Sequence, residues 1–110
     1  MIQANLLLTK DRSPFGFRVR GHALFDEEGR DIVCAGVSAI AINTVNSLEI
    51  LCHASVSLRQ EEGFLEAVLA PPASEDSKLL LRSFGLGMEQ IRKAYGSEYL
   101  SYQEIVEEEP

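Results

Sequence analysis

The sequence predicts an α+β fold, in which two main helices pack on a mostly antiparallel sheet in the order ββαββα(β). Three observations lead to this prediction. Short runs of alternating apolar and other residues come in pairs, as in β-hairpins. A longer stretch with apolar residues at helical spacing follows each pair. The length of 110 residues suits one domain with a real core. We therefore expect a single two-layer domain over residues 1–110.

The first two strands are predicted near the N-terminus. Residues 2–8 alternate, which places four apolar side chains on one face of a strand, namely Ile2, Ala4, Leu6 and Leu8. A polar turn over residues 10–14 leads to a second alternating run. That run carries Phe15, Phe17 and Val19 and ends at Gly21-His22. A short turn between two alternating runs indicates a hairpin.

The first helix is expected from Asp31 to about Cys52. Aspartate is a favoured N-cap residue, worth about 1 kcal/mol over alanine. The first turns of this segment are apolar nearly all round, so we expect the helix to be buried on both sides. In so small a protein, the second covering surface would be another subunit. The apolar run itself, residues 32–42, is shorter than the 20 or so residues of a membrane span.

The remaining elements follow the same pattern. Ala54, Val56 and Leu58 alternate in a third strand, and a turn over residues 60–63 leads to a fourth strand, residues 64–70. A second helix is predicted over residues 74–95, with Gly96 as its C-terminal stop. Gly85 and Gly87 weaken that helix by about 1 kcal/mol each, which close packing of its backbone against a neighbour would offset. Residues 99–106 are expected to form a last short edge strand.

The charge of the chain limits the classes of molecule that it could bind. The net charge of −7 and the isoelectric point near 4.7 argue against nucleic acid as a direct ligand and suit a basic protein or peptide. Part of the acidity lies in Glu107, Glu108 and Glu109, which we interpret as a solvated tail. The first residues have no basic flank and no cleavage-type small-residue site, so we expect a cytoplasmic protein without a membrane partner.

Cys34 is the candidate nucleophile. If Asp31 caps the helix, Cys34 falls in the first turn, where backbone N–H groups lack helical partners and the helix dipole favours negative charge. A thiol in such a place, beside a histidine, can have a pKa lowered from about 8.5 to roughly 3.5–7.5. His22 lies twelve residues earlier, at the end of the second strand, and the connecting loop is long enough to bring the two side chains together.

This pair could hydrolyse an amide, with the Cys34 thiolate attacking the carbonyl and His22 acting first as acid and then as base. The backbone N–H groups of Cys34 and Ala35 are candidate oxyanion donors. Asp31 either orients the imidazole or only caps the helix. Ser38 either lines the site or bonds back to its own helix. The alternative for Cys34 is an inert core cysteine.

The other cysteine and histidine have structural interpretations. Cys52 continues the apolar stripe of the first helix, and His53 ends it. On paper, the four residues Cys34, Cys52, His22 and His53 could form a metal site, but they lack the close cysteine spacing of structural zinc sites. We therefore expect no metal, no cofactor and, in a cytosolic chain, no structural disulfide.

Several motifs together resemble the ribosomal-processing cysteine protease (Prp) family. They are Gly21-His22-Ala23, the run from Gly29 to Ala35 with Val37-Ser38-Ala39, the segment Thr44 to Leu48, and the late Gly85-Leu86-Gly87 with Ile91 and Ala94-Tyr95. The resemblance covers essentially the whole chain. Gly36 and Gly96-Ser97 depart from the pattern, and neither change removes a catalytic part.

The resemblance implies a small cytoplasmic homodimer that removes a short N-terminal extension from a large-subunit ribosomal protein, cutting after an aromatic residue. It assigns the nucleophile to Cys34, the acid/base to His22 and a supporting role to Asp31. It also implies that the loop between them closes on the substrate, through Ala23, Leu24, Phe25, Asp26, Glu27, Glu28, Gly29 and Arg30. The competing hypothesis is a non-catalytic, ribosome-associated module that binds a peptide.

Overall fold

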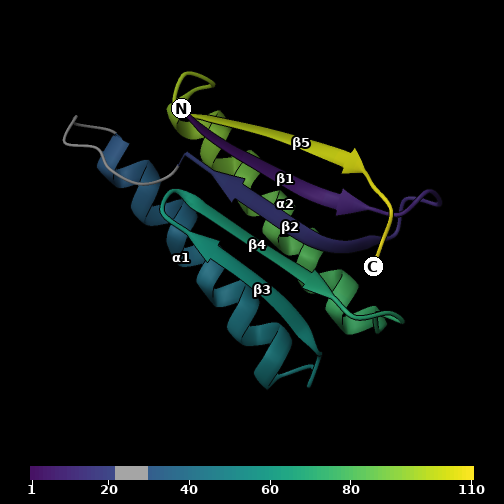
Figure 1. Ribbon diagram of the computed structural model, residues 1–110. Coiled ribbons are helices and arrows are strands. Elements are labelled where there is room, and N and C mark those ends of the chain that lie inside the picture. Colours follow the sequence, from purple (N-terminus) through teal and green to yellow (C-terminus); the bar gives the residue numbers. More distant parts are fainter. Residues whose placement is uncertain (22–29) are drawn as a thin grey trace.

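The computed structural model describes residues 1–21 and 30–110 and has two layers, a five-stranded sheet with two helices on one face (Figure 1). The elements, in chain order, are β1 (Ile2–Leu8), β2 (Pro14–Arg20), α1 (Arg30–Ile50), β3 (Val56–Glu61), β4 (Phe64–Leu69), α2 (Glu75–Tyr95) and β5 (Leu100–Val106). The predicted fold class and element order are confirmed, with ends that differ by a residue or two.

The sheet is mixed, in the order β3-β4-β2-β1-β5. Three of the neighbouring pairs are antiparallel, and the pair β1–β5 is parallel. Parallel pairing needs a crossover, and α2 supplies it by carrying the chain across the sheet between β4 and β5. The expectation of a mostly antiparallel sheet with the last strand at its edge is confirmed.

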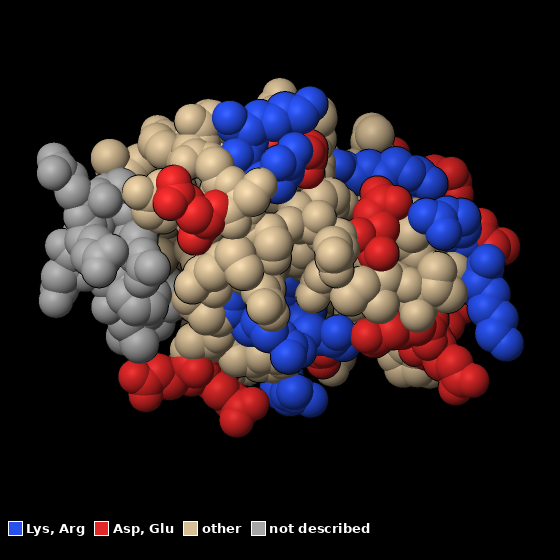
Figure 2. Space-filling view, turned by 90° about the horizontal axis from the view of Figure 1, so that it is seen from above, with Lys and Arg blue, Asp and Glu red and all other residues tan. Residues whose placement is uncertain are grey.

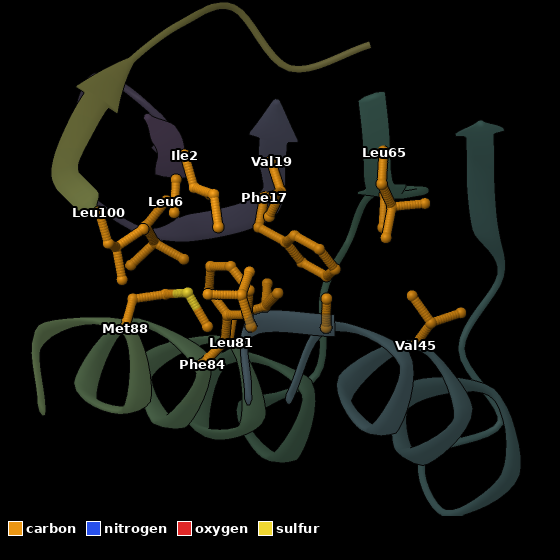
Figure 3. Close-up of a cluster of buried hydrophobic side chains, with 14 of the residues drawn as sticks. Ile2, Leu6, Phe17, Val19, Val45, Leu65, Leu81, Phe84, Met88 and Leu100 are labelled. Atoms are coloured by element: carbon orange, nitrogen blue, oxygen red, sulfur yellow. The ribbon is translucent and has the colours of Figure 1, made fainter. Parts of the chain in front are cut away.

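The core lies between the sheet and the helices (Figure 3). The four alternating side chains of β1 are all buried there, as the pattern predicts. At its centre, the rings of Phe17 on β2 and Phe84 on α2 stack with their centroids 4.2 Å apart. Aliphatic side chains from both helices surround this pair, which fits a chain without tryptophan.

The helix α1 has one buried face and one open face. Val33, Val37 and Ala41 are buried, while Ile32 and Ile42 are 56% and 57% exposed. The single chain therefore covers one face of α1, and the expected burial of the second face by another subunit stays a prediction. The length argument needs correction, because residues 32–50 have a mean hydropathy of 1.4 and are long enough to cross a membrane by length and composition alone. Packing on the sheet accounts for the apolar face, as in a core helix.

The helix α2 has a capping residue at each end, of which Gly96 was predicted. The Ser74 hydroxyl accepts a hydrogen bond from the Ser77 amide at its start, and Gly96 donates to the Arg92 carbonyl at its end. The two glycines inside it allow close packing: a side chain at Gly85 would collide with the Tyr102 hydroxyl, and a Cβ at Gly87 would lie 2.9 Å from Ile40 of α1. The expected compensation for these glycines is therefore present.

An ion-pair network lies on the open face of the sheet. Arg18 of β2 donates to Glu66 of β4 at 2.8 Å and to both carboxylate oxygens of Glu107 at 2.9 Å. These bonds raise the pKa of the Arg18 guanidinium and lower that of Glu107. Glu107 is thus docked on the sheet, which corrects its interpretation as part of a solvated tail. Elsewhere charges of both signs intermix, as the face in Figure 2 shows.

Candidate active site

Cys34 lies close to the start of α1, as its fifth residue. Its side chain is half-buried and packs against the core cluster, so the sulfur sits at the boundary between the core and the surface. Residues four apart share a helix face, which puts Cys34, Ser38 and Ile42 in one line along α1. We call this line the Cys34 face.

The start of α1 differs from the prediction. The helix begins at Arg30, so Asp31 is its second residue and not its cap. In the regular helical pattern, the amide of Cys34 then lies opposite the carbonyl of Arg30, and that of Ala35 opposite Asp31. The unpaired amides of the first turn belong to residues before Cys34. The role of the Cys34 and Ala35 amides as oxyanion donors stays a prediction.

His22 and residues 23–29 of the loop lie outside the described residues. The pairing of His22 with Cys34, the orienting role of Asp31 and the closing of residues 23–30 on a substrate therefore stay predictions. The structure does describe the end of β2 and Gly21, the residue that precedes His22. Gly21 donates a hydrogen bond to the Gly63 carbonyl in the β3–β4 turn at 2.7 Å. This bond fixes the residue that precedes His22 to the same end of the sheet as the start of α1 (Figure 1).

Replacing Gly21 with alanine is expected to destabilise the protein and slow cleavage. Gly21 has φ +76°, and an added Cβ would lie 2.7 Å from the Met1 carbonyl oxygen. Strain of this kind costs about 1–3 kcal/mol of unfolding free energy. Relief of the strain would displace residue 21, which is bonded directly to His22. Gly63→Ala is the matched control, because Gly63 has φ +71° but nothing within 4 Å of the added Cβ. Thermal unfolding and cleavage rates of both variants test this, and equal effects would contradict it.

A small pocket opens beside the Cys34 face. It has a volume of about 50 Å³ and lies between α1 and the sheet. Its walls are Val19, Val37, Ser38, Ala41, Ile42, Gln60 and Leu65. Ser38 thus lines a pocket one helical turn beyond Cys34. Sequence reasoning missed the other walls because they come from four separate elements, and no local pattern connects them.

Two arginines flank an aromatic ring at the same end of the sheet. The guanidinium groups of Arg20 and Arg59 lie 5.4 Å and 4.7 Å from the ring centroid of Phe64. Phe64 directly follows Gly63, so this cationic pair stands beside the Gly21–Gly63 hydrogen bond. This end of the sheet therefore carries local positive charge, although the protein as a whole is negative.

The remaining cysteine and histidine lie at the far end of α1. Cys52 is half-buried after the helix ends, and His53 is exposed with a positive φ of 52°. Within residues 1–21 and 30–110, no group of three or more His, Cys, Asp or Glu side chains could hold a metal ion.

Comparisons with known proteins agree on one family. The sequence matches the family of cysteine protease Prp over residues 1–100. It is 31% identical over 101 residues to the ribosomal processing cysteine protease Prp of Bacillus subtilis (strain 168), covering 86% of this chain and 90% of that protein. A crystal structure from Streptococcus mutans is similar, with a TM-score of 0.84, 31% identity and coverage of 97% and 96% of the two chains.

A further structure shares the fold. The ribosomal processing protease Prp from S. aureus, solved in complex with a substrate peptide, superposes with a TM-score of 0.86 over 96% of this chain and 100% of that one. Its sequence is 21% identical.

Proposed function

This chain belongs to the cysteine protease Prp family, and from that premise we propose that it removes a short N-terminal extension from a large-subunit ribosomal protein. The chain is a cysteine protease, and its relative in B. subtilis is the ribosomal processing cysteine protease Prp. One observation of this chain supports the site in particular: Cys34 is half-buried close to the N-terminal end of α1, the end of a helix that favours negative charge.

The proposed reaction has two steps. The Cys34 thiolate attacks the scissile carbonyl, a C–S bond forms, and the tetrahedral intermediate collapses as the C–N bond breaks. His22 protonates the departing amine. Water then attacks the thioester while His22 accepts its proton, which releases the new carboxyl terminus and regenerates the thiolate. Asp31 would orient the imidazole, and Ser38 would contact the substrate from the next turn of α1.

The charge of the chain supports a basic substrate. Ribosomal proteins are basic, and the net charge of −7 favours encounter with a positively charged extension. We propose that the reaction takes place in the cytoplasm, as the resemblance to the Prp family implies.

We also propose that the protein works as a homodimer. Ile32 of α1 and Leu86 of α2 are 56% and 60% exposed on the outer helix surface. Between the helices, Ala39 and Gly87 line a groove of about 340 Å³. A second copy could bury these apolar groups, and exposed clusters of this kind mark association surfaces. Sedimentation equilibrium of the purified protein measures the mass directly.

Mass spectrometry of the ribosomal protein tests the proposed substrate. In cells with this protease, the mature protein should begin after the cleavage site. In cells depleted of the protease, the same ribosomal protein should carry its extension. A mature N-terminus in depleted cells would contradict the proposal, and so would an intact extension when the protease is present.

A further inference from the structure

We propose that the peptide substrate binds as an additional strand along the outer edge of β3, with an apolar side chain in the pocket beside the Cys34 face. The inference rests on the proposed function, because it concerns how a peptide reaches Cys34. Proteins that recognise extended peptides often add them to a sheet edge, where main-chain hydrogen bonds give affinity and side-chain pockets give specificity.

The strand β3 has the properties of a receptive edge. It is the outermost strand next to β4, and it lies alongside α1 in Figure 1. Its six residues, VSLRQE, contain no proline, and all but Val56 are exposed. Natural edges are usually protected by prolines, bulges or covering loops, because their unpaired backbone groups attract another strand. Among residues 1–21 and 30–110, β3 itself has no proline, and it pairs with β4 without a bulge.

The register of the hairpin shows which backbone groups face outward. Antiparallel neighbours alternate between pairs that exchange hydrogen bonds and pairs that do not. The Ser55 carbonyl accepts from the Ala70 amide at 3.0 Å, so Ser55 and the residues at every second position after it bond to β4. The N–H and C=O groups of Leu58 and Gln60 therefore point away from the sheet.

The same two residues direct their side chains toward the helix layer. Leu58 pairs with Ala67 and Gln60 with Leu65, and both partners are buried on the helix side of β4. Gln60 and Leu65 line the pocket together with Ser38 and Ile42 of the Cys34 face. A peptide paired with Leu58 and Gln60 would direct every second side chain toward this pocket.

Continuity with Cys34 identifies the occupant as the substrate. The pocket wall at Ser38 lies four residues from Cys34, which is about 6 Å along the helix axis. A strand added to β3 would thus run past the sulfur-bearing face of α1, with its side chain held in the pocket. A second copy of the chain is the other possible occupant of this edge, and the experiment below distinguishes the two.

The test is a backbone scan of the substrate. Peptides that carry the cleavage site are synthesised with a single N-methyl group at each successive position, which removes one N–H donor at a time. We expect kcat/KM to fall about tenfold at alternate positions, the loss expected for one hydrogen bond, and to change little at the positions between. A flat scan, with the unmodified peptide still cleaved, would overturn the inference and leave the proposed function standing. No cleavage of any peptide would refute the function itself.

A pair of protein variants gives the complementary result. Leu58→Pro removes an outward N–H without breaking a bond to β4, a position where edge strands tolerate proline. Leu58→Ala keeps that N–H and loses only the side chain. We expect KM to rise about tenfold more for proline than for alanine, with kcat unchanged. If Leu58→Pro fails to fold, the peptide scan decides alone. Equal KM values for the two variants would overturn the inference. If the proline variant changes only the mass of the assembly, the edge belongs to a second copy, and the inference is overturned as well.

Discussion

Replacing Cys34 with alanine is expected to abolish cleavage of the ribosomal precursor while leaving the fold intact. Without the sulfur there is no nucleophile to form the thioester, so turnover should fall by at least about a thousandfold. The fold should survive, because Cys34 is only half-buried and α1 buries most of its apolar area through other residues. Product formation by mass spectrometry and thermal unfolding together measure both effects.

Cys52 provides the matched control. It is also half-buried, but it lies beyond the C-terminal end of α1, at the opposite end of the helix from Cys34. Cys52→Ala should cleave normally. Iodoacetamide should label Cys34 well below pH 8 and Cys52 much more slowly. Normal cleavage by Cys34→Ala would show that the assigned nucleophile is wrong.

Replacing Phe84 with alanine should cause the largest loss of stability. Phe84 is 1% exposed, and its ring stacks on Phe17 where α2 meets β2. Removing a buried aromatic ring costs about 3–5 kcal/mol of unfolding free energy, a large part of the roughly 5–15 kcal/mol that stabilises a typical domain. Urea unfolding of the variant and the parent protein measures this difference.

Leu79→Ala on the same helix serves as the reference. Leu79 is 64% exposed, so its truncation should change the unfolding free energy by no more than about 0.5 kcal/mol. If Phe84→Ala cost as little as Leu79→Ala, the stacked pair would not be the centre of the core.

Local patterns predicted most of the fold because they depend on neighbouring residues. Alternation identified β1 and β2, and Gly96 marked the end of α2. Features that depend on contacts between distant segments were harder to predict. The parallel pairing of β5 with β1 and the docking of Glu107 on Arg18 depend on contacts between distant segments, and the acidic run at the C-terminus gives no local sign of either.

The candidate site shows the same division. Cys34 was identified from its place at the start of an apolar helix, and the structure puts it close to that start. The helix begins at Arg30, one residue before the predicted start at Asp31. The pocket walls at Val19, Gln60 and Leu65 come together only through the tertiary fold. The pairing with His22 stays a prediction.

The position of the two chain ends has a practical consequence for handling the protein. The Met1 carbonyl lies so close to Gly21 that an added methyl group would collide with it, so an affinity tag fused ahead of Met1 would emerge beside the residue that leads to His22. Pro110 lies at the opposite end of β1, near Ser55 and Pro71. Tags, fluorophores and surface immobilisation should therefore be attached after Pro110, which leaves the approach to the nucleophile open.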